Sequence, residues 1–214
     1  MCSVAWNSRF DILATGSRDG TVVLWSVKSL NAIATFSANS GAVLSVAWNQ
    51  NGNLLAVAYE RNSVKVWDAN LKKVIFEFKS NNYGKFTSVT WSPKSSELAA
   101  ANSNTTTLVY NVLLGKVRLT LTGHEEKVVF VTWSPDGTRI ATASTDKTAI
   151  VWDSQSGVAL FTLKAHSSPL TSVTWRKDGN RLATASEGGT VNIWECTENT
   201  IHSSKKLSFL NFRF

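Results

Sequence analysis

Tryptophan recurs at a nearly constant spacing along this 214-residue chain, and this repeat constrains the fold more than any other feature. One set closes the segments SVAW, SVAW, SVTW, FVTW and SVTW, at spacings of 42, 43, 42 and 42 residues: Trp6, Trp48, Trp91, Trp133 and Trp175. A second set follows 19 residues behind the first: Trp25, Trp67, Tyr110, Trp152 and Trp194. Because the two sets keep the same phase throughout, they indicate five copies of one structural unit.

Each unit consists of short β-branched or aromatic runs separated by turn residues, without the 3.6-residue period of an amphipathic helix. In the first unit these runs predict strands at residues 2–6, 12–17, 21–25 and 32–36. Glycine, with asparagine, aspartate or proline, marks turns at residues 49–52, 134–137 and 177–179. Four short strands in about 42 residues predict an all-β chain built from propeller blades rather than a helical solenoid.

Several dipeptides carry a resemblance to a known family. Trp67-Asp68 and Trp152-Asp153 are complete WD dipeptides, and Gly123-His124 is a GH dipeptide. Weaker forms of the WD dipeptide close the other units: Trp25-Ser26, Tyr110-Asn111 and Trp194-Glu195. On these residues the chain resembles the WD40 family over residues 1 to about 195. The resemblance implies a β-propeller of four-stranded antiparallel blades, with repeats at 1–36, 37–79, 80–121, 122–163 and 164–214, the last with an atypical tail.

The number of units is smaller than a closed propeller of this family usually contains. The resemblance implies a ring of about seven blades. We therefore expect an incomplete or open propeller, or a fragment whose missing repeats lie upstream of Met1, rather than a closed five-blade ring. An arc completed by another chain is a further alternative. In the tail, residues 195–204 predict a long loop, and residues 205–214 are either a last strand or an unrelated apolar end.

The resemblance also implies a hydrogen-bonded tetrad that holds a blade together. Its members are complete only in the fourth unit: His124, Thr142, Asp146 and Trp152. We expect this tetrad to be structural, because its strand position buries the hydroxyl and no G-x-S-x-G elbow accompanies it. The first unit retains Thr15, Asp19 and Trp25, and the fifth retains His166, Thr184 and Trp194 with Gly188 at the acid position. The second and third units have neither the histidine nor the acid, so we expect them to depend on apolar packing alone.

Catalysis is not expected from the residues nearest the propeller axis. The predicted first strands of the five units contain no Asp, Glu or His, so a general acid and base have no place there. The sequence also contains no phosphate-binding loop, metal-ligand spacing or nucleotide fingerprint. We expect no cofactor, metal or small-molecule substrate.

Because the sequence has no secretory leader and no long apolar run, we expect a cytoplasmic or nuclear protein that does not enter a membrane.

The partner is expected to be another protein. The net charge of +7 is spread over the units, and the fourth unit is acidic, so a dedicated nucleic-acid groove is not indicated. A basic propeller that contacts RNA or DNA in a ribonucleoprotein or chromatin complex remains the alternative.

In WD40 proteins the partner often lies on the face where the first strand of each blade begins, and this places the candidate contact residues. They occupy the early part of that strand, the position two residues earlier (Lys85 and Lys127), or the turn between the second and third strands. Tyr83 is added as an aromatic near the same rim. These residues are Arg18, Leu44, Glu60, Tyr83, Lys85, Thr87, Ser103, Lys127, Val129, Thr145, Thr171 and Glu187. The predicted function is a non-catalytic scaffold that presents these loops to partner proteins or peptides.

Overall fold

The computed structural model describes residues 2–70, 72–79, 84–94, 96–164, 166–197 and 200–208. Within these ranges the regular structure consists of twenty β-strands, which form five antiparallel four-stranded sheets. The prediction of an all-β propeller with five four-stranded blades is therefore confirmed. Among the described residues, no helix is long and apolar enough to cross a membrane.

The strands follow the chain order within every blade. Blade 1 contains β1 (Ser3–Trp6), β2 (Ile12–Gly16), β3 (Thr21–Ser26) and β4 (Ala32–Ser37). Blade 2 contains β5 (Val43–Trp48), β6 (Leu54–Tyr59), β7 (Ser63–Asp68) and β8 (Lys73–Lys79). Blade 3 contains β9 (Phe86–Trp91), β10 (Glu97–Asn102), β11 (Thr106–Asn111) and β12 (Lys116–Thr122). Blade 4 contains β13 (Val128–Trp133), β14 (Arg139–Ser144), β15 (Thr148–Asp153) and β16 (Ala159–Lys164). Blade 5 contains β17 (Leu170–Trp175), β18 (Arg181–Ser186), β19 (Thr190–Cys196) and β20 (Ile201–Ser208).

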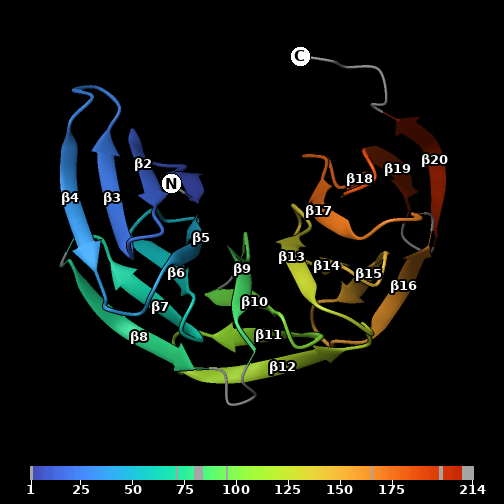
Figure 1. The fold of residues 1–214 in the computed structure, drawn as a ribbon, viewed down its shortest axis with the longest axis horizontal. Coiled ribbons are helices and arrows are strands. Elements are labelled where there is room, and N and C mark those ends of the chain that lie inside the picture. The colour runs from blue at the N-terminus through green and yellow to red at the C-terminus, as the bar shows by residue number, and fades with distance from the viewer. Residues whose placement is uncertain are drawn as a thin grey trace.

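The blades stand side by side in an arc around a common centre (Figure 1). The first strand of each blade lies on the inside of the arc and the fourth strand on the outside. A gap separates blade 1 from blade 5, and no strand pairing among the described residues joins these two blades. The molecule is thus an open propeller, as expected from its number of repeats.

The turns between the first and second strands set the pairing register of each blade. In blades 2, 4 and 5 a glycine with φ between 72° and 76° occupies these turns: Gly52, Gly137 and Gly179. The amide of each glycine donates to the carbonyl three residues earlier, at 2.9–3.0 Å. Positive φ costs glycine little, so these turns form without strain and bring the first-strand tryptophan opposite an Ile or Leu of the second strand.

The apolar core consists of one layer between each pair of neighbouring blades. Between blades 1 and 2, for example, Val22 and Leu24 pack with Val46, Trp48 and other buried residues of blade 2. Equivalent layers join the later blades. Full burial of a large apolar side chain contributes about 1.5–3 kcal/mol. Each blade is therefore stabilised mainly by its neighbours and not by a core of its own.

The tail differs in part from its prediction. Residues 201–208 form β20, which pairs with β19 from Cys196↔Ile201 to Thr190↔Ser208. The expectation that residues 195–204 form a long loop is wrong for 195–196, which end β19, and for 201–204, which begin β20. Backbone pairing between the two strands outweighs the polar composition of 201–204. Residues 209–214 lie outside the described part of the chain.

Candidate interaction face

One end of the blades carries most of the predicted contact residues, and we call it the interaction face. It is formed by the segments that precede each first strand and by the turns between each second and third strand. A backbone hydrogen bond of 2.8–3.0 Å joins these two segments in blades 2 to 5. The donor and acceptor pairs are Glu60 N to Ala42 O, Ser103 N to Lys85 O, Thr145 N to Lys127 O, and Glu187 N to Pro169 O. The bond holds each turn against the start of the neighbouring strand.

A β-bulge recurs on this face at the start of the first strand. In blade 4 the pairing passes from Val128↔Ser144 to Phe130↔Ala143, so Val129 has no partner in the ladder. The residues skipped in this way in blades 2 to 5 are Leu44, Thr87, Val129 and Thr171. All four are predicted contact residues. A bulge turns the side chain of the extra residue away from regular pairing, and bulges often lie beside functional sites.

The four tetrad residues of blade 4 are joined by a chain of hydrogen bonds that runs from Asp146 through His124 and Thr142 to Trp152. His124 Nδ1 lies 2.7 Å from Asp146 Oδ2, and His124 Nε2 lies 2.8 Å from Thr142 Oγ1. Trp152 Nε1 donates to Thr142 Oγ1 at 2.9 Å. Thr142 is fully buried, so its hydroxyl lies out of reach of a substrate. The geometry suits a structural link and not a nucleophile.

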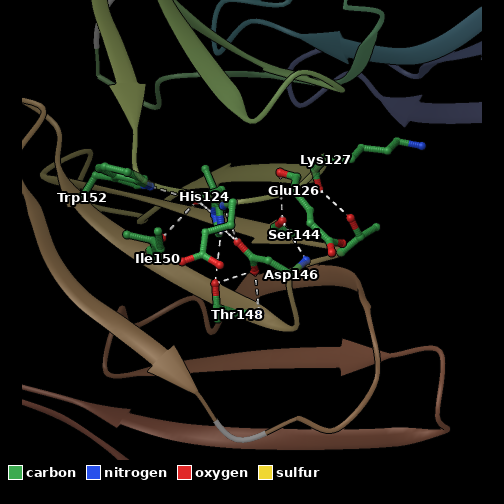
Figure 2. A network of polar contacts seen from close by, with 11 residues as sticks. His124, Glu126, Lys127, Ser144, Asp146, Thr148, Ile150 and Trp152 are labelled. Atoms are coloured by element: carbon green, nitrogen blue, oxygen red, sulfur yellow. Dashed lines mark hydrogen bonds and ion pairs between the residues drawn. The ribbon is translucent and has the colours of Figure 1, made fainter.

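Further bonds connect the tetrad to the interaction face, as Figure 2 shows. Thr148 donates to Asp146 Oδ1 through its amide at 2.8 Å and its hydroxyl at 2.6 Å. The amide of Asp146 donates to Ser144 Oγ at 3.1 Å, and Ser144 Oγ donates to the carbonyl of Glu126 at 3.2 Å. The segment before β13 and the turn after β14 are therefore fixed to each other by side chains as well as by backbone.

Burial determines the protonation of the tetrad. Burial disfavours the imidazolium and lowers the pKa of His124, although the neighbouring Asp146 opposes this shift. Burial also opposes the ionisation of Asp146, but hydrogen bonds from Thr148 and His124 outweigh it and hold the pKa of Asp146 below its usual value. We therefore assign a neutral imidazole that donates from Nδ1 to Asp146 and accepts at Nε2 from Thr142.

Blades 1 and 5 contain partial versions of this network. In blade 5, His166 Nε2 lies 2.8 Å from Thr184 Oγ1, and His166 Nδ1 lies 2.9 Å from Thr190 Oγ1. The hydroxyl of Thr190 thus occupies the role of the missing acid, which the sequence pattern did not reveal. In blade 1, Trp25 Nε1 donates to Thr15 Oγ1 at 2.9 Å, without a histidine.

The expectation that blades 2 and 3 depend on apolar packing alone is too simple. In blade 2, Lys65 Nζ donates to the carbonyl of Ala38 at 3.3 Å. In blade 3, Thr106 Oγ1 donates to Asn104 Oδ1 at 2.8 Å. Polar side chains of other types therefore stabilise the segment before β5 in blade 2 and the turn after β10 in blade 3.

The predicted contact residues differ in exposure. The exposed ones are Arg18, Glu60, Lys85, Lys127, Thr171 and Glu187. The partly buried ones are Leu44, Thr87, Ser103, Val129 and Thr145, whereas Tyr83 lies outside the described residues.

Three of these contact residues, Glu60, Lys85 and Thr87, form side-chain contacts between blades. Lys85 Nζ lies 2.8 Å from Glu60 Oε1, and this contact lowers the pKa of Glu60. Thr87 Oγ1 donates to the carbonyl of Val128 in the next blade at 2.7 Å. Lys85 and Thr87 therefore help to align blade 3 with its neighbours.

The inner strands line a cavity of about 420 Å³ at the centre of the arc. Its lining is made of apolar side chains and of hydroxyls from Ser3, Ser45, Ser88, Thr90, Thr132 and Thr174. Within the described ranges, no cluster of three or more His, Cys, Asp or Glu residues could hold a metal ion.

Comparison with known families agrees with this architecture. The family model described as WDR19 first beta-propeller matches residues 2–171, and the model described as WD domain, G-beta repeat matches residues 157–195. No curated protein matches the chain. The first model covers well over half of the sequence and includes the tryptophan frames of blades 1 to 4, while the second covers most of blade 5. The chain therefore belongs to the WD40 β-propellers, in the family of the WDR19 first beta-propeller.

Proposed function

We propose that this protein is a non-catalytic scaffold that binds partner proteins or peptides through its interaction face. The observation that carries the proposal is the repeated bulge, which sets Leu44, Thr87, Val129 and Thr171 beside the turns that bear the other candidate residues. Such a surface combines variable side chains with a rigid support, which suits recognition.

The chemistry of the central cavity supports a binding role. Serine and threonine hydroxyls and apolar groups line it, and these are poor general acids and bases unless a neighbouring group activates them. The buried imidazole of His124 is engaged by Asp146 and Thr142 and lies in the blade instead of the cavity.

The charges on the interaction face support a protein partner over a nucleic acid. Positive and negative side chains are both exposed there, and the ammonium of Lys85 is paired with Glu60. A nucleic-acid surface would instead concentrate unpaired positive charge along one track. An uncharged or mixed-charge protein segment fits this pattern better.

A capture experiment with matched variants tests the proposal. Lys85→Glu with Lys127→Glu changes two exposed residues of the interaction face, and Lys94→Glu with Lys177→Glu makes the same charge change on exposed turns at the other end of the blades. We expect proteins captured from cell extract by the wild type to be lost with the first pair and retained with the second. Equal capture by both variants would contradict the proposal, as would salt-sensitive binding of random RNA by the wild type.

A further inference from the structure

The turn between β11 and β12 in blade 3 displays two leucines to solvent. Leu113 and Leu114 are 73% and 69% exposed, and Val117, near the start of β12, is 49% exposed. Blades 2 and 4 pack on the two sides of this blade, so the leucines are exposed although both neighbours are in place. Single exposed apolar side chains are common, but adjacent ones at the tip of a turn mark a candidate interaction site.

Hydrogen bonds hold the two leucines in position. Asn111 Oδ1 accepts from the amide of Leu114 at 3.0 Å, and the amide of Gly115 donates to the carbonyl of Val112 at 3.3 Å. Val112 is fully buried, and its own amide donates to the carbonyl of Ser96 at 3.0 Å. The base of the turn is therefore anchored in the blade, while its tip projects from it.

The equivalent turn of blade 4 shows that this backbone geometry does not require leucine. There Asp153 Oδ1 accepts from the amide of Ser156 at 2.7 Å, and a glycine with positive φ follows, as in blade 3. The two leucine positions are occupied by polar residues, Gln155 and Ser156. The leucines are thus not needed to form the turn, and a partner that covers them would account for their presence.

Lysines lie next to the leucines. Lys116 follows the turn of blade 3 directly, and Lys72 and Lys73 lie in the equivalent turn of blade 2. All three are exposed. The turn of blade 3 also lies close to blade 2, because a Cβ at Gly115 would be 3.4 Å from the ring of Phe76 in β8. In Figure 1, β8 and β12 follow one another along the outside of the arc.

The charge around the leucines is mainly positive. The turns of blades 2 and 3, residues 68–74 and 111–117, contain three lysines and one carboxylate. That carboxylate, Asp68, lies opposite Lys73 in the ladder and accepts from the amide of Asn70 at 2.9 Å. The turn of blade 4, residues 153–158, contains neither lysine nor leucine. We name the following residues the leucine–lysine patch: Lys72, Lys73, Leu113, Leu114, Lys116 and Val117.

We propose that the leucine–lysine patch binds the surface of a membrane that contains anionic lipids. Leu113 and Leu114 insert below the headgroups, and the lysine ammonium groups pair with the negative charges of the lipids. The long stems of the lysines let these ammonium groups stay at the level of the headgroups. The contact is peripheral, because only the tip of a turn enters the lipid. It lies at the end of the blades opposite the interaction face.

The shape of the patch favours a lipid surface over an acidic protein. The leucines stand on the tip of a turn, so a protein would have to present a matching pocket, whereas fluid lipid adapts to a protruding side chain. The turn is already held by its own hydrogen bonds, so insertion orders little additional chain. The expectation from the sequence that the chain does not enter a membrane rested on the absence of a long apolar run, and two leucines in a turn form no such run.

Flotation of the whole chain with lipid vesicles tests the proposal. We expect binding to vesicles of phosphatidylcholine with phosphatidylserine, little binding to phosphatidylcholine alone, and a loss of binding as salt increases. Leu113→Gln with Leu114→Ser copies the turn of blade 4, so this variant should keep the urea midpoint of the wild type. Its affinity for the mixed vesicles should fall about tenfold to a hundredfold.

Two matched lysine pairs test the part played by charge. Lys72→Gln with Lys73→Gln should lower the affinity for the mixed vesicles about tenfold to thirtyfold. Lys127→Gln with Lys147→Gln removes the same charge from exposed residues at the other end of the blades and should change the affinity less than about twofold.

A fluorescent label at the turn locates the contact. In the Cys2→Ser background, Leu113→Cys and, separately, Gln155→Cys place a thiol at equivalent positions of blades 3 and 4, while Cys196 is buried. With a nitrobenzoxadiazole label, the mixed vesicles should shift the emission to shorter wavelength at position 113 and leave it unchanged at position 155.

Any of four results would overturn the proposal. These are no binding to the mixed vesicles, equal binding to phosphatidylcholine alone, unchanged affinity of the leucine variant, and equal spectral shifts at the two labelled positions. Binding of a polyglutamate peptide that the leucine and lysine variants weaken, without binding of vesicles, would also overturn it, since that would make an acidic protein the occupant.

Discussion

Removal of one buried hydroxyl should show how much the tetrad contributes to stability. Thr142 Oγ1 links the indole of Trp152 and the imidazole of His124, at 2.9 and 2.8 Å, and the residue is fully buried. Thr142→Val keeps the shape of the side chain but leaves an N–H donor and a ring nitrogen without a partner. Each unsatisfied buried group costs about 1–3 kcal/mol. Because single substitutions rarely cost more than about 4 kcal/mol, we expect a loss of about 2–4 kcal/mol in the free energy of unfolding.

Thr15→Val is the matched control. Thr15 accepts the same bond from Trp25 at 2.9 Å, but Trp25 is 37% exposed, so water can replace the lost partner. This change should cost less than about 1 kcal/mol. Thr142→Ser retains the hydroxyl and separates the lost bonds from the lost methyl group.

Urea unfolding followed by far-ultraviolet circular dichroism measures the difference. With a slope of about 2 kcal/mol per molar urea, Thr142→Val should lower the midpoint by about 1–2 M. Hydrogen exchange in residues 128–164 should locate the loss in blade 4, because blades in a repeat array can open separately. Equal losses for Thr142→Val and Thr15→Val would refute the reasoning that the buried hydrogen bonds of the tetrad stabilise the blade.

Three other outcomes follow from the structure. The folded-state pKa of His124 lies below 6.5, so as the pH falls below that value the unfolded chain binds the proton first, and the free energy of unfolding should decline. Urea midpoints measured from pH 7.5 to 5 should decline less steeply for His124→Gln. An equal decline would contradict the assignment of a neutral, buried imidazole. Burial raises the pKa of Cys196 to about 11, whereas Cys2 is exposed. Iodoacetamide at neutral pH should therefore label Cys2 alone, and Cys2→Ser should abolish labelling of the folded protein. Thr87→Val removes the 2.7 Å bond to blade 4 and should lower the free energy of unfolding in urea by about 1 kcal/mol. The hydroxyl of Thr171 bonds within its own blade at 3.3 Å, so Thr171→Val should cost less. The reverse order would refute the role of Thr87 in joining the blades.

The sequence predicted the blades better than the details of their polar contacts. Tryptophan spacing and turn glycines report on burial and backbone geometry, which are local properties, and they were sufficient for the five sheets. The four bulges could not be predicted, because Val129 and its counterparts follow the same alternation as paired residues. The role of Thr190 in blade 5 and the bond from Thr87 to Val128 also depend on residues that only folding brings together. The early start of β20 was missed because polar residues, His202, Ser203 and Ser204, follow Ile201 directly.

The bulge at Leu44, Thr87, Val129 and Thr171 has a consequence for how such a protein diversifies. A residue that makes no ladder pair can change in size or polarity without shifting the alignment of the strands on either side of it. The neighbouring turn is secured independently, by a backbone bond that is insensitive to side-chain identity. New specificities can therefore arise at Leu44 and Thr171 at little cost to folding, whereas Thr87 also bonds to the next blade and Val129 packs against the apolar core.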